Sequence, residues 1–187
     1  ETLESLAQGF ETALRALVDL CRDEAACGYT ASDFPLAPVT QERLDRLAVQ
    51  QGRGVAALYP LSPMQQGMAF HSLADDPVGS VYFEQLTWKI TNPFRPDAFR
   101  AAWHALVERH PILRSALWLE DAEPLQYVRR DATLPWRDLD WRDLETDKQT
   151  EALEQLLAKE RGAGFDLTRP PLLRCLLVRL EEDVWQF

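Results

Sequence analysis

The fold is decided by residues 59–73, which read Tyr59-Pro60-Leu61-Ser62-Pro63-Met64-Gln65-Gln66-Gly67-Met68-Ala69-Phe70-His71-Ser72-Leu73. The Ser62 hydroxyl can accept a hydrogen bond from the backbone N–H of Gln65, and the Gln65 side chain can accept one in return. Pro63 suits the first position of a helix, because the N–H that it lacks needs no partner there. The pattern therefore predicts a helix that begins at Pro63 and ends before Asp75-Asp76-Pro77.

The residues that follow this helix show strand and helix patterns in turn. Val81–Ile90 alternates in polarity and is rich in aromatic and branched residues, which predicts a strand. Pro96–Arg109 carries an apolar stripe with helical spacing. Ile112–Leu119 and Leu125–Arg129 flank the acidic segment Glu120-Asp121-Ala122-Glu123-Pro124 and predict a hairpin.

The last third of the chain adds one more helix and two strands. Leu134–Leu144 has no period and is expected to be irregular, whereas Thr146 and Gln149 repeat the capping pattern and predict a helix. Pro171–Leu180 and Val184–Phe187 predict two strands around an acidic turn. This order predicts an α/β (α+β) fold with a mixed, largely antiparallel sheet and helices packed on it.

The front of the chain has a different organisation. Residues 3–21 have the apolar spacing of an amphipathic helix, and 28–40 carry two prolines and no period, which predicts an extended linker. A short helix is expected from Gln41 to about Val49, and the main domain from about Leu58. The expected divisions are a helix in 1–27, a linker with a short helix in 28–57, and a main lobe in 58–187.

Composition excludes several classes of protein. The formal net charge of -10 argues against binding to nucleic acid, and no apolar run is long enough to span a bilayer. The three cysteines, Cys21, Cys27 and Cys175, form no CxxC pair, and Cys175 lies in an apolar run, so it is expected in the core. A cytoplasmic protein without a metal site is the expectation.

No catalytic constellation is visible in the sequence. There is no glycine-rich phosphate loop and no G-x-S-x-G pattern, and the three histidines, His71, His104 and His110, are not at metal-ligand spacing. Two interpretations of His71 stand side by side. It is a half-buried helix residue in contact with the sheet, or it lines a channel beside an active site.

Three segments together resemble the condensation domain family of non-ribosomal peptide synthetases. Residues 59–73 are similar to the first core motif of that family, in the form YPLSPMQxGMLFHSL. Residues 108–117, Glu108-Arg109-His110-Pro111-Ile112-Leu113-Arg114-Ser115-Ala116-Leu117, resemble the second motif, RHExLRTxF, with departures at Pro111, Ser115 and Leu117. Phe165-Asp166-Leu167 followed by Pro170-Pro171-Leu172-Leu173-Arg174 resembles the stretch FDLxxxPLxR.

The resemblance implies the fold of chloramphenicol acetyltransferase, of which residues 58–187 are expected to form part of the N-terminal lobe. It implies a domain that joins donor and acceptor aminoacyl or peptidyl thioesters through an amide. The substrates hang on the phosphopantetheine arms of upstream and downstream carrier proteins, and no cofactor binds directly. The family's catalytic motif, HHxxxDG, is absent from the 187 residues. The chain is expected to be truncated before it, to hold no catalytic residue and to be inactive alone.

The resemblance also assigns expected roles to residues of the first two motifs. Arg114 resembles the arginine that pairs with the Asp of HHxxxDG, and Arg109 and His110 belong to the same motif. Residues expected to line a substrate tunnel come from the first motif: Ser62, Met64, Gln65, Gly67, Met68 and His71.

Residues 1–50 resemble the tail of an upstream epimerisation or condensation domain and the linker after it. An upstream epimerisation domain implies a D-configured donor and an L-configured acceptor, with an adenylation domain as a further neighbour. Three alternatives stay open: an epimerisation domain of the same fold, a non-catalytic docking or linker platform, and a stand-alone acyltransferase that uses coenzyme A.

Overall fold

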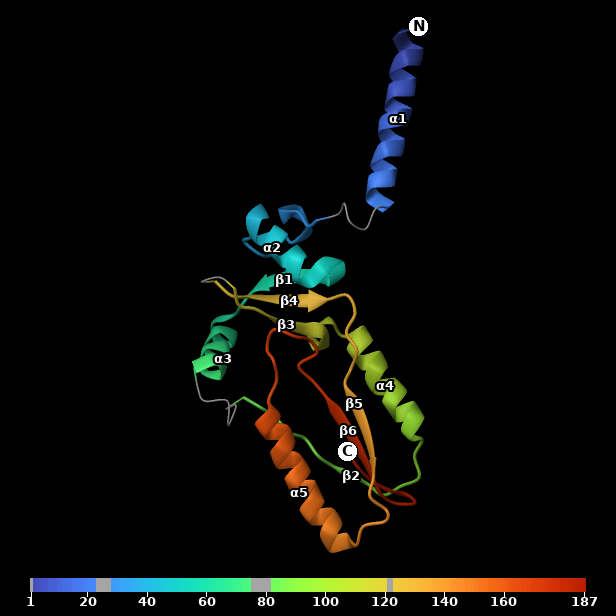
Figure 1. Ribbon diagram of the computed structural model, residues 1–187, viewed down its shortest axis with the longest axis vertical. Coiled ribbons are helices and arrows are strands. Elements are labelled where there is room, and N and C mark those ends of the chain that lie inside the picture. Colours follow the sequence, from blue (N-terminus) through green and yellow to red (C-terminus); the bar gives the residue numbers. More distant parts are fainter. Residues whose placement is uncertain (1, 23–27, 75–81, 121–122) are drawn as a thin grey trace. The chain divides into compact units, whose positions relative to one another are not determined.

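The computed structural model describes residues 2–22, 28–74, 82–120 and 123–187. The chain divides into two compact units, residues 1–54 and 55–187 (Figure 1). Within the described ranges, no helix has both the length and the apolar character needed to cross a bilayer. Some predicted features lie outside the described residues: Cys27 with the end of segment 1–27, the helix stop at 75–77, Val81, and residues 121–122 of the acidic turn.

The first unit contains the two helices that the sequence predicts. Helix α1 spans Thr2–Arg22, and none of its described side chains is buried. Helix α2 spans Gln41–Gln51 and begins after Thr40, whose hydroxyl accepts a hydrogen bond from the amide of Arg43 at 3.4 Å. Both helix predictions are confirmed.

Residues 28–34 are folded, so the prediction of an extended linker is wrong for this stretch. A short 3-10 helix spans Ala31–Asp33, and the rings of Tyr29 and Phe34 pack at a centroid distance of 5.1 Å. The Tyr29 hydroxyl donates to the carbonyl of Gly52 at 2.7 Å. Tyr29 and Phe34 are buried together, but their spacing fits neither a helix nor a strand. The sequence pattern therefore did not indicate that this stretch is folded.

The second unit begins with a three-stranded antiparallel sheet in the order β1-β4-β3. The hairpin of β3 (Ser115–Trp118) and β4 (Leu125–Arg129) is confirmed. Strand β1 (Val55–Pro60) pairs with β4 and starts before the expected beginning of the domain near Leu58. A register shift between Val55 and Ala57 breaks the alternation in β1, so no strand pattern was visible there.

A four-stranded sheet in the order β2-β7-β6-β5 forms the other half of this unit. The expected pair around the second acidic turn is confirmed, with β6 and β7 antiparallel. Strand β5 runs parallel to β6, which makes the sheet mixed. The strands span Lys89–Ile90 (β2), Trp136–Asp140 (β5), Cys175–Glu181 (β6) and Val184–Gln186 (β7).

Two predictions about these strands are wrong. Of the described residues in the expected strand Val81–Ile90, Lys89–Ile90 form β2 and Trp88 exchanges two backbone hydrogen bonds with Phe187, both at 3.0 Å, whereas 82–87 are not in a strand. Residues 134–144 were expected to be irregular but contain β5. Strand β5 lies at the sheet edge and carries charged residues, so its pattern does not reveal a strand whose partner is distant in sequence.

Helix α3 (Pro63–Ala74) starts as the capping pattern predicts. The amide of Ser62 donates to Oε1 of Gln65 at 2.9 Å, and the amide of Gln65 donates to Oγ of Ser62 at 3.3 Å. Helix α4 (Pro96–Arg109) is also confirmed.

Helix α5 (Thr146–Ala163) is confirmed, but its predicted capping pair is wrong. The residue before its first turn is Glu145, which makes no side-chain cap. Gln149 instead donates to the carbonyls of Trp141 and Leu180, both at 2.9 Å. The side chain therefore ties the helix to the end of β6, a role that local spacing cannot show.

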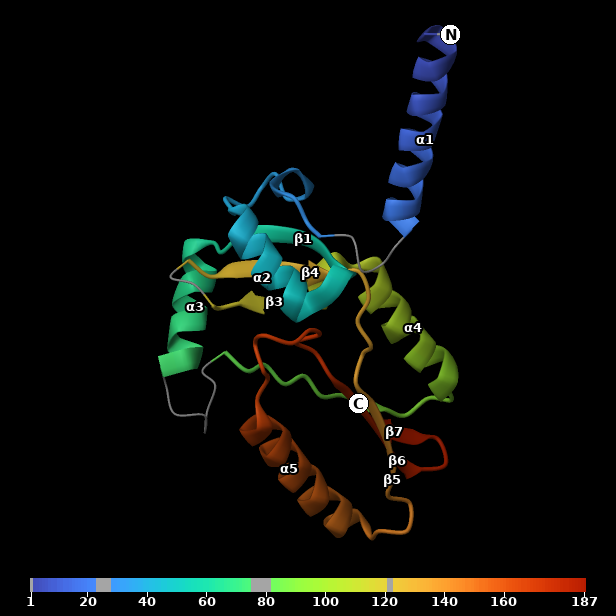
Figure 2. The same ribbon diagram turned by 45° about the horizontal axis from the view of Figure 1, so that its top comes forward.

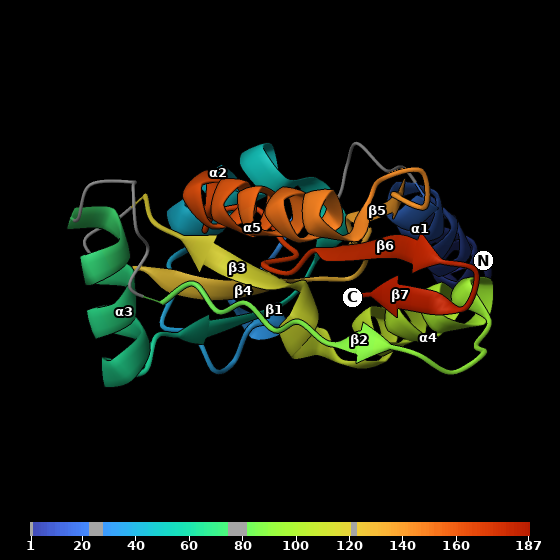
Figure 3. The same cartoon turned by 90° about the horizontal axis from the view of Figure 1, so that it is seen from below.

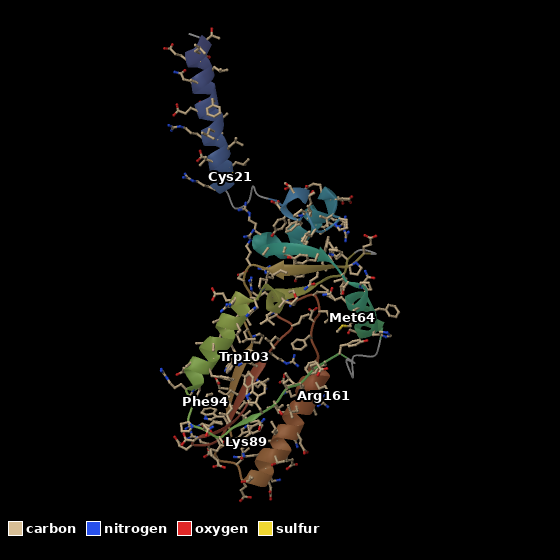
Figure 4. The ribbon with its side chains drawn as sticks, turned by 180° about the vertical axis from the view of Figure 1, so that it is seen from behind. Cys21, Met64, Lys89, Phe94, Trp103 and Arg161 are labelled. Atoms are coloured by element: carbon tan, nitrogen blue, oxygen red, sulfur yellow. The ribbon has the colours of Figure 1, made fainter. Side chains whose placement is uncertain are left out.

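Helices α4 and α5 lie on opposite sides of the four-stranded sheet (Figures 1 and 2), and Figure 3 shows α5 beside β6. On the α4 side, Val107, Leu134 and Cys175 are buried together. The ring of Phe187 stacks on Trp103 at 5.3 Å (Trp103 is labelled in Figure 4). Further rings surround Phe187: Trp88, Phe99 and Trp136.

Burial of Cys175 generates a prediction about thiol chemistry. Desolvation raises the pKa of this thiol to about 11, so little reactive thiolate forms at pH 8. The part of the free energy of unfolding that depends on the neutral thiol is fully present below pH 9.0, the ordinary pKa of the thiol. It is lost as the pH rises toward 11. We expect iodoacetamide at pH 8 to label the exposed Cys21 readily and Cys175 only after denaturation. Peptide mapping by mass spectrometry checks this, and equal labelling rates in the folded chain contradict it.

Candidate functional site

A cavity of about 740 Å³ lies within the unit formed by residues 55–187. Its walls come from α3, residues 82–88, β3, α5, and the segment that leads into β6. Leucine is the commonest residue of the lining, which includes Leu86, Leu117, Leu153, Leu156, Leu157 and Leu172. A concave and mostly apolar site with a few polar groups is typical of a binding pocket for small molecules or chain ends.

All three motif segments reach this cavity. The first contributes Gln65, Met68 and His71, and the second contributes Ile112 and residues 115–117. The third contributes Phe165, Leu167 and residues 172–174. Segments that are distant in sequence therefore meet around one space, which local patterns could not show.

The remaining three residues expected from the first motif do not line the cavity. Ser62 caps α3, and Met64 is 77% exposed on that helix (Met64 is labelled in Figure 4). A Cβ placed on Gly67 would meet no atom within 4 Å, so this glycine faces open space. A tunnel-lining role for Ser62, Met64 and Gly67 stays a prediction.

Gln65 and His71 have different surroundings. Nε2 of Gln65 donates to Oε1 of the buried Gln126 at 3.0 Å, which joins α3 to β4 at the cavity wall. His71 is exposed, and its ring lies 5.7 Å from that of Phe70 and 6.5 Å from that of Tyr82. Of its two interpretations, the position at the cavity fits the structure and the half-buried position does not.

Arg109 and His110 of the second motif lie at the end of α4, and both are exposed. The amide of His110 donates to the carbonyl of Leu106 at 2.9 Å and closes the last turn. Neither residue lines the cavity. Their geometry supports a structural role at the junction between α4 and the 3-10 helix Pro111–Arg114.

Arg114 binds backbone carbonyls at two chain segments. Its Nε donates to the carbonyl of Val107 at 3.0 Å, and Nη2 donates to that of Glu108 at 3.2 Å. Its Nη1 donates to the carbonyls of Arg129 and, at 2.5 Å, Arg130. These bonds use four of the five N–H donors of the guanidinium and connect the end of α4 to the end of β4.

The third motif is attached to the three-stranded sheet. The amide of Leu117 donates to the carbonyl of Leu167 at 2.7 Å, and the Tyr127 hydroxyl donates to the carbonyl of Thr168 at 2.6 Å. Burial raises the pKa of this tyrosine. Thr168 donates to Asp166 through its hydroxyl and its amide, which holds the pKa of Asp166 below its usual value. The turn that begins this motif is thus fixed by the bonds between Thr168 and Asp166 and by the bonds from the three-stranded sheet.

One buried carboxylate beside the cavity was missed by the sequence reasoning. Glu160, near the end of α5, is only 8% exposed. Its Oε2 lies 2.6 Å from Nε of Arg174, and its Oε1 lies 3.1 Å from Nη2 of Arg137. The only sequence signal for this ion pair is the arginine of the third motif, because acidic residues are common on helix surfaces.

Comparison with known proteins agrees with this geometry. Residues 55–187 match the family model described as Condensation domain. Over 187 residues the chain is 43% identical to a linear gramicidin synthase polypeptide of Brevibacillus parabrevis. The match covers 100% of this chain but only 4% of that protein.

Two solved structures share the fold. A four-domain non-ribosomal peptide synthetase bound to AMP and glycine matches with a TM-score of 0.61 and 21% identity, covering 71% of this chain and 10% of the other. The starter condensation domain of rhizomide synthetase matches with a TM-score of 0.53 and 21% identity, covering 69% and 30%. These likenesses confirm the architecture of the chloramphenicol acetyltransferase type that the sequence implies.

The carbonyl contacts of Arg114 generate a stability prediction for the chain. Arg114→Ala removes the guanidinium donors from four backbone carbonyls, two of them in part-buried bonds, so we expect the free energy of unfolding to fall by about 2 to 3 kcal/mol. Urea denaturation measures this. Arg109→Ala is the matched control, because it removes an exposed arginine of the same motif, and we expect it to cost less than about 0.5 kcal/mol. Equal effects of the two substitutions contradict the bridging role.

Proposed function

The chain belongs to the condensation domain family, and we propose that residues 55–187 serve a domain that forms amide bonds in a non-ribosomal peptide synthetase. In this reaction the amine of an acceptor attacks the carbonyl carbon of a donor thioester. The new C–N bond forms, the C–S bond breaks, and the amine proton leaves to balance the released thiol. Both substrates are held as thioesters on carrier proteins.

The observation that carries this proposal is the meeting of the three motif segments at one cavity. A site that joins two chains needs an apolar space from which water is excluded, so that aminolysis is favoured over hydrolysis. The leucine-rich lining supplies such a surface. Apolar residues outnumber polar ones in the lining, which favours recognition of side chains and arms by shape.

The chain supplies walls for this reaction and no general base. HHxxxDG is not among the 187 residues, and His71, His104 and His110 match no part of it. The phosphopantetheine arms of upstream and downstream carrier proteins would bring the substrates, and no cofactor is proposed to bind the chain itself. A synthetase of this kind acts in the cytoplasm in secondary metabolite and antibiotic biosynthesis.

The features of residues 1–54 favour the presence of a neighbouring domain in the same protein. They form a compact unit of their own, and the similarity to the linear gramicidin synthase polypeptide extends through them. We propose that residues 1–27 are the tail of an upstream epimerisation or condensation domain, and that an adenylation domain is a further neighbour. An epimerisation domain upstream would deliver a D-configured donor to an L-configured acceptor.

The geometry of Arg114 limits how it could contact the Asp of HHxxxDG. Four of its N–H donors already bind carbonyls, so one N–H is left for a carboxylate unless these bonds rearrange. We propose a single charge-assisted hydrogen bond rather than a bidentate pair. Arg114 is then a positioning residue, which holds the end of β4 as well as the motif.

The proposal predicts opposite outcomes for the chain alone and for the synthetase module that contains it. The 187-residue chain, mixed with two loaded carrier proteins, is expected to form no amide, because it lacks the catalytic histidine. The module with the same substrates is expected to form the dipeptide and to prefer a D-configured donor. Mass spectrometry of the carrier-bound product measures both.

Controls separate this function from the alternatives. Replacing the second His of HHxxxDG in the module by Ala is expected to abolish the product while leaving both carrier proteins loaded. Amide formation by the isolated chain would contradict the proposal that it forms the cavity walls and supplies no general base. Racemisation of the donor with no amide formed would instead indicate an epimerisation domain.

A further inference from the structure

Arg174 contacts three separate parts of the cavity wall. Its Nε pairs with Oε2 of Glu160 at 2.6 Å, and Nη1 donates to the carbonyl of Gly164 at 2.6 Å. Its Nη2 donates to the carbonyl of Glu160. The guanidinium also lies over the rings of Phe165 at 4.4 Å and Phe83 at 5.4 Å.

These contacts converge on the end of α5. Gly164, the C-cap of α5, has a positive φ of 56°, which glycine adopts without the strain that a Cβ would cause. The carbonyls of Glu160 and Gly164 lie in and just after the last turn, where helix carbonyls lack partners. Arg174, the residue before β6, therefore caps α5 with its guanidinium donors.

The same guanidinium orders segment 82–88, which lines the cavity along its length. Phe83 stacks on Phe165 with a centroid distance of 5.4 Å and an interplanar angle of 25°, and the arginine covers both rings. Gln85 forms a second attachment, because its Nε2 donates to the carbonyl of Leu157 at 3.0 Å and its Oε1 accepts from Arg161 at 2.8 Å (Arg161 is labelled in Figure 4).

Burying charges in this way is costly unless the groups are well paired. The side chains of Arg174 and Glu160 are 20% and 10% exposed, and Arg137 provides a second cation for the carboxylate. An apolar packing could join α5 to β6 at lower cost. An arginine instead fixes the orientation of the two segments, since its planar donors match two carbonyls and a carboxylate in one geometry only.

We propose that Arg174 is a positioning residue that fixes the cavity walls formed by segment 82–88, Phe165 and the end of α5, and so sets the size of aminoacyl side chain that the cavity accepts. The link to aminoacyl substrates rests on the proposed function. The link between Arg174 and the walls rests on the contacts alone. The two parts can therefore be tested apart.

Arg179, which lies in β6, provides a matched control. It pairs with Oε1 of Glu182 at 2.7 Å, donates to the carbonyl of Glu182 at 2.9 Å, and lies over the ring of Trp185 at 5.1 Å. Its contacts are thus of the same kinds as those of Arg174, but Arg179 does not line the cavity. Arg179→Lys and Arg174→Lys each keep the charge and lose the planar fork.

The first test uses the 187-residue chain and needs no substrate. Hydrogen–deuterium exchange in Arg174→Lys is expected to rise about tenfold for amides in residues 82–88 and 164–168, and to stay unchanged in β1 and β4. Arg179→Lys is expected to leave both regions unchanged. Unaltered exchange in 82–88 of Arg174→Lys overturns the wall-fixing role.

The second test uses the synthetase module and measures kcat and KM for donors, then acceptors, that differ in side-chain size. Arg174→Lys is expected to reduce the ratio of kcat/KM between the best and the poorest side chain by about tenfold on one of the two sides, through KM. Arg179→Lys is expected to leave the kcat/KM ratios unchanged for donors and for acceptors. A uniform fall of kcat for every substrate, or unchanged ratios, overturns the selectivity role.

A further variant covers the case in which Arg174→Lys does not fold. Phe83→Leu removes one ring of the stack and leaves the ion pairs of Glu160 in place, and it is expected to change the same ratio in the same direction. Absence of amide product from the unaltered module would count against the proposed function. It would leave the exchange result, and hence the positioning role, to stand on its own.

Discussion

The hydrogen bond from the amide of Leu117 to the carbonyl of Leu167 joins the two halves of the domain, and the cavity depends on it. It attaches the third motif to the edge of β3, and the bond from Tyr127 to Thr168 secures the same turn from β4. Backbone groups that are shielded from water need partners, so these bonds fix the position at which the third motif contacts the three-stranded sheet. From there the chain runs along the cavity to Arg174 and enters β6.

The two sides of the four-stranded sheet are stabilised in different ways. On the α4 side, aromatic rings gather around Phe187, and edge-to-face and stacked contacts make a dense apolar core. On the α5 side, the ion pair of Glu160 and Arg174 and the bonds of Gln85 and Gln149 connect the helix to its surroundings. The apolar core on the α4 side is well suited to stabilise the folded domain. The second side has the directional contacts that give a cavity a defined shape.

Local sequence patterns predicted the elements whose signals lie close together in the chain. The Ser62 and Gln65 pair marked the start of α3, and the β3–β4 hairpin followed from two apolar runs around an acidic turn. Strand β5 was missed because its partner β6 lies far along the sequence. Residues 82–87 have the composition of a strand, but Gln85 bonds to α5 and Phe83 packs on the third motif, and strand pairing begins at Trp88.

The candidate site was predicted in part for the same reason. Motif resemblance brought Gln65, Met68 and His71 to attention, and all three line the cavity. Glu160 could not be found, since a single acidic residue in a helix carries no pattern. Arg114 was found, but its binding of carbonyls at two chain segments is a property of the folded chain alone.

The central claim is that the cavity bounded by the three motifs receives the aminoacyl thioester. The most direct measurement is photo-crosslinking of the synthetase module with a carrier protein whose phosphopantetheine arm holds a diazirine-bearing aminoacyl group in a non-hydrolysable linkage. Peptide mapping is predicted to find adducts in residues 82–88, in α3 at Met68, or in residues 165–174. Adducts confined to residues 2–22 and to the outer face of α5, with none on the cavity lining, would contradict the account.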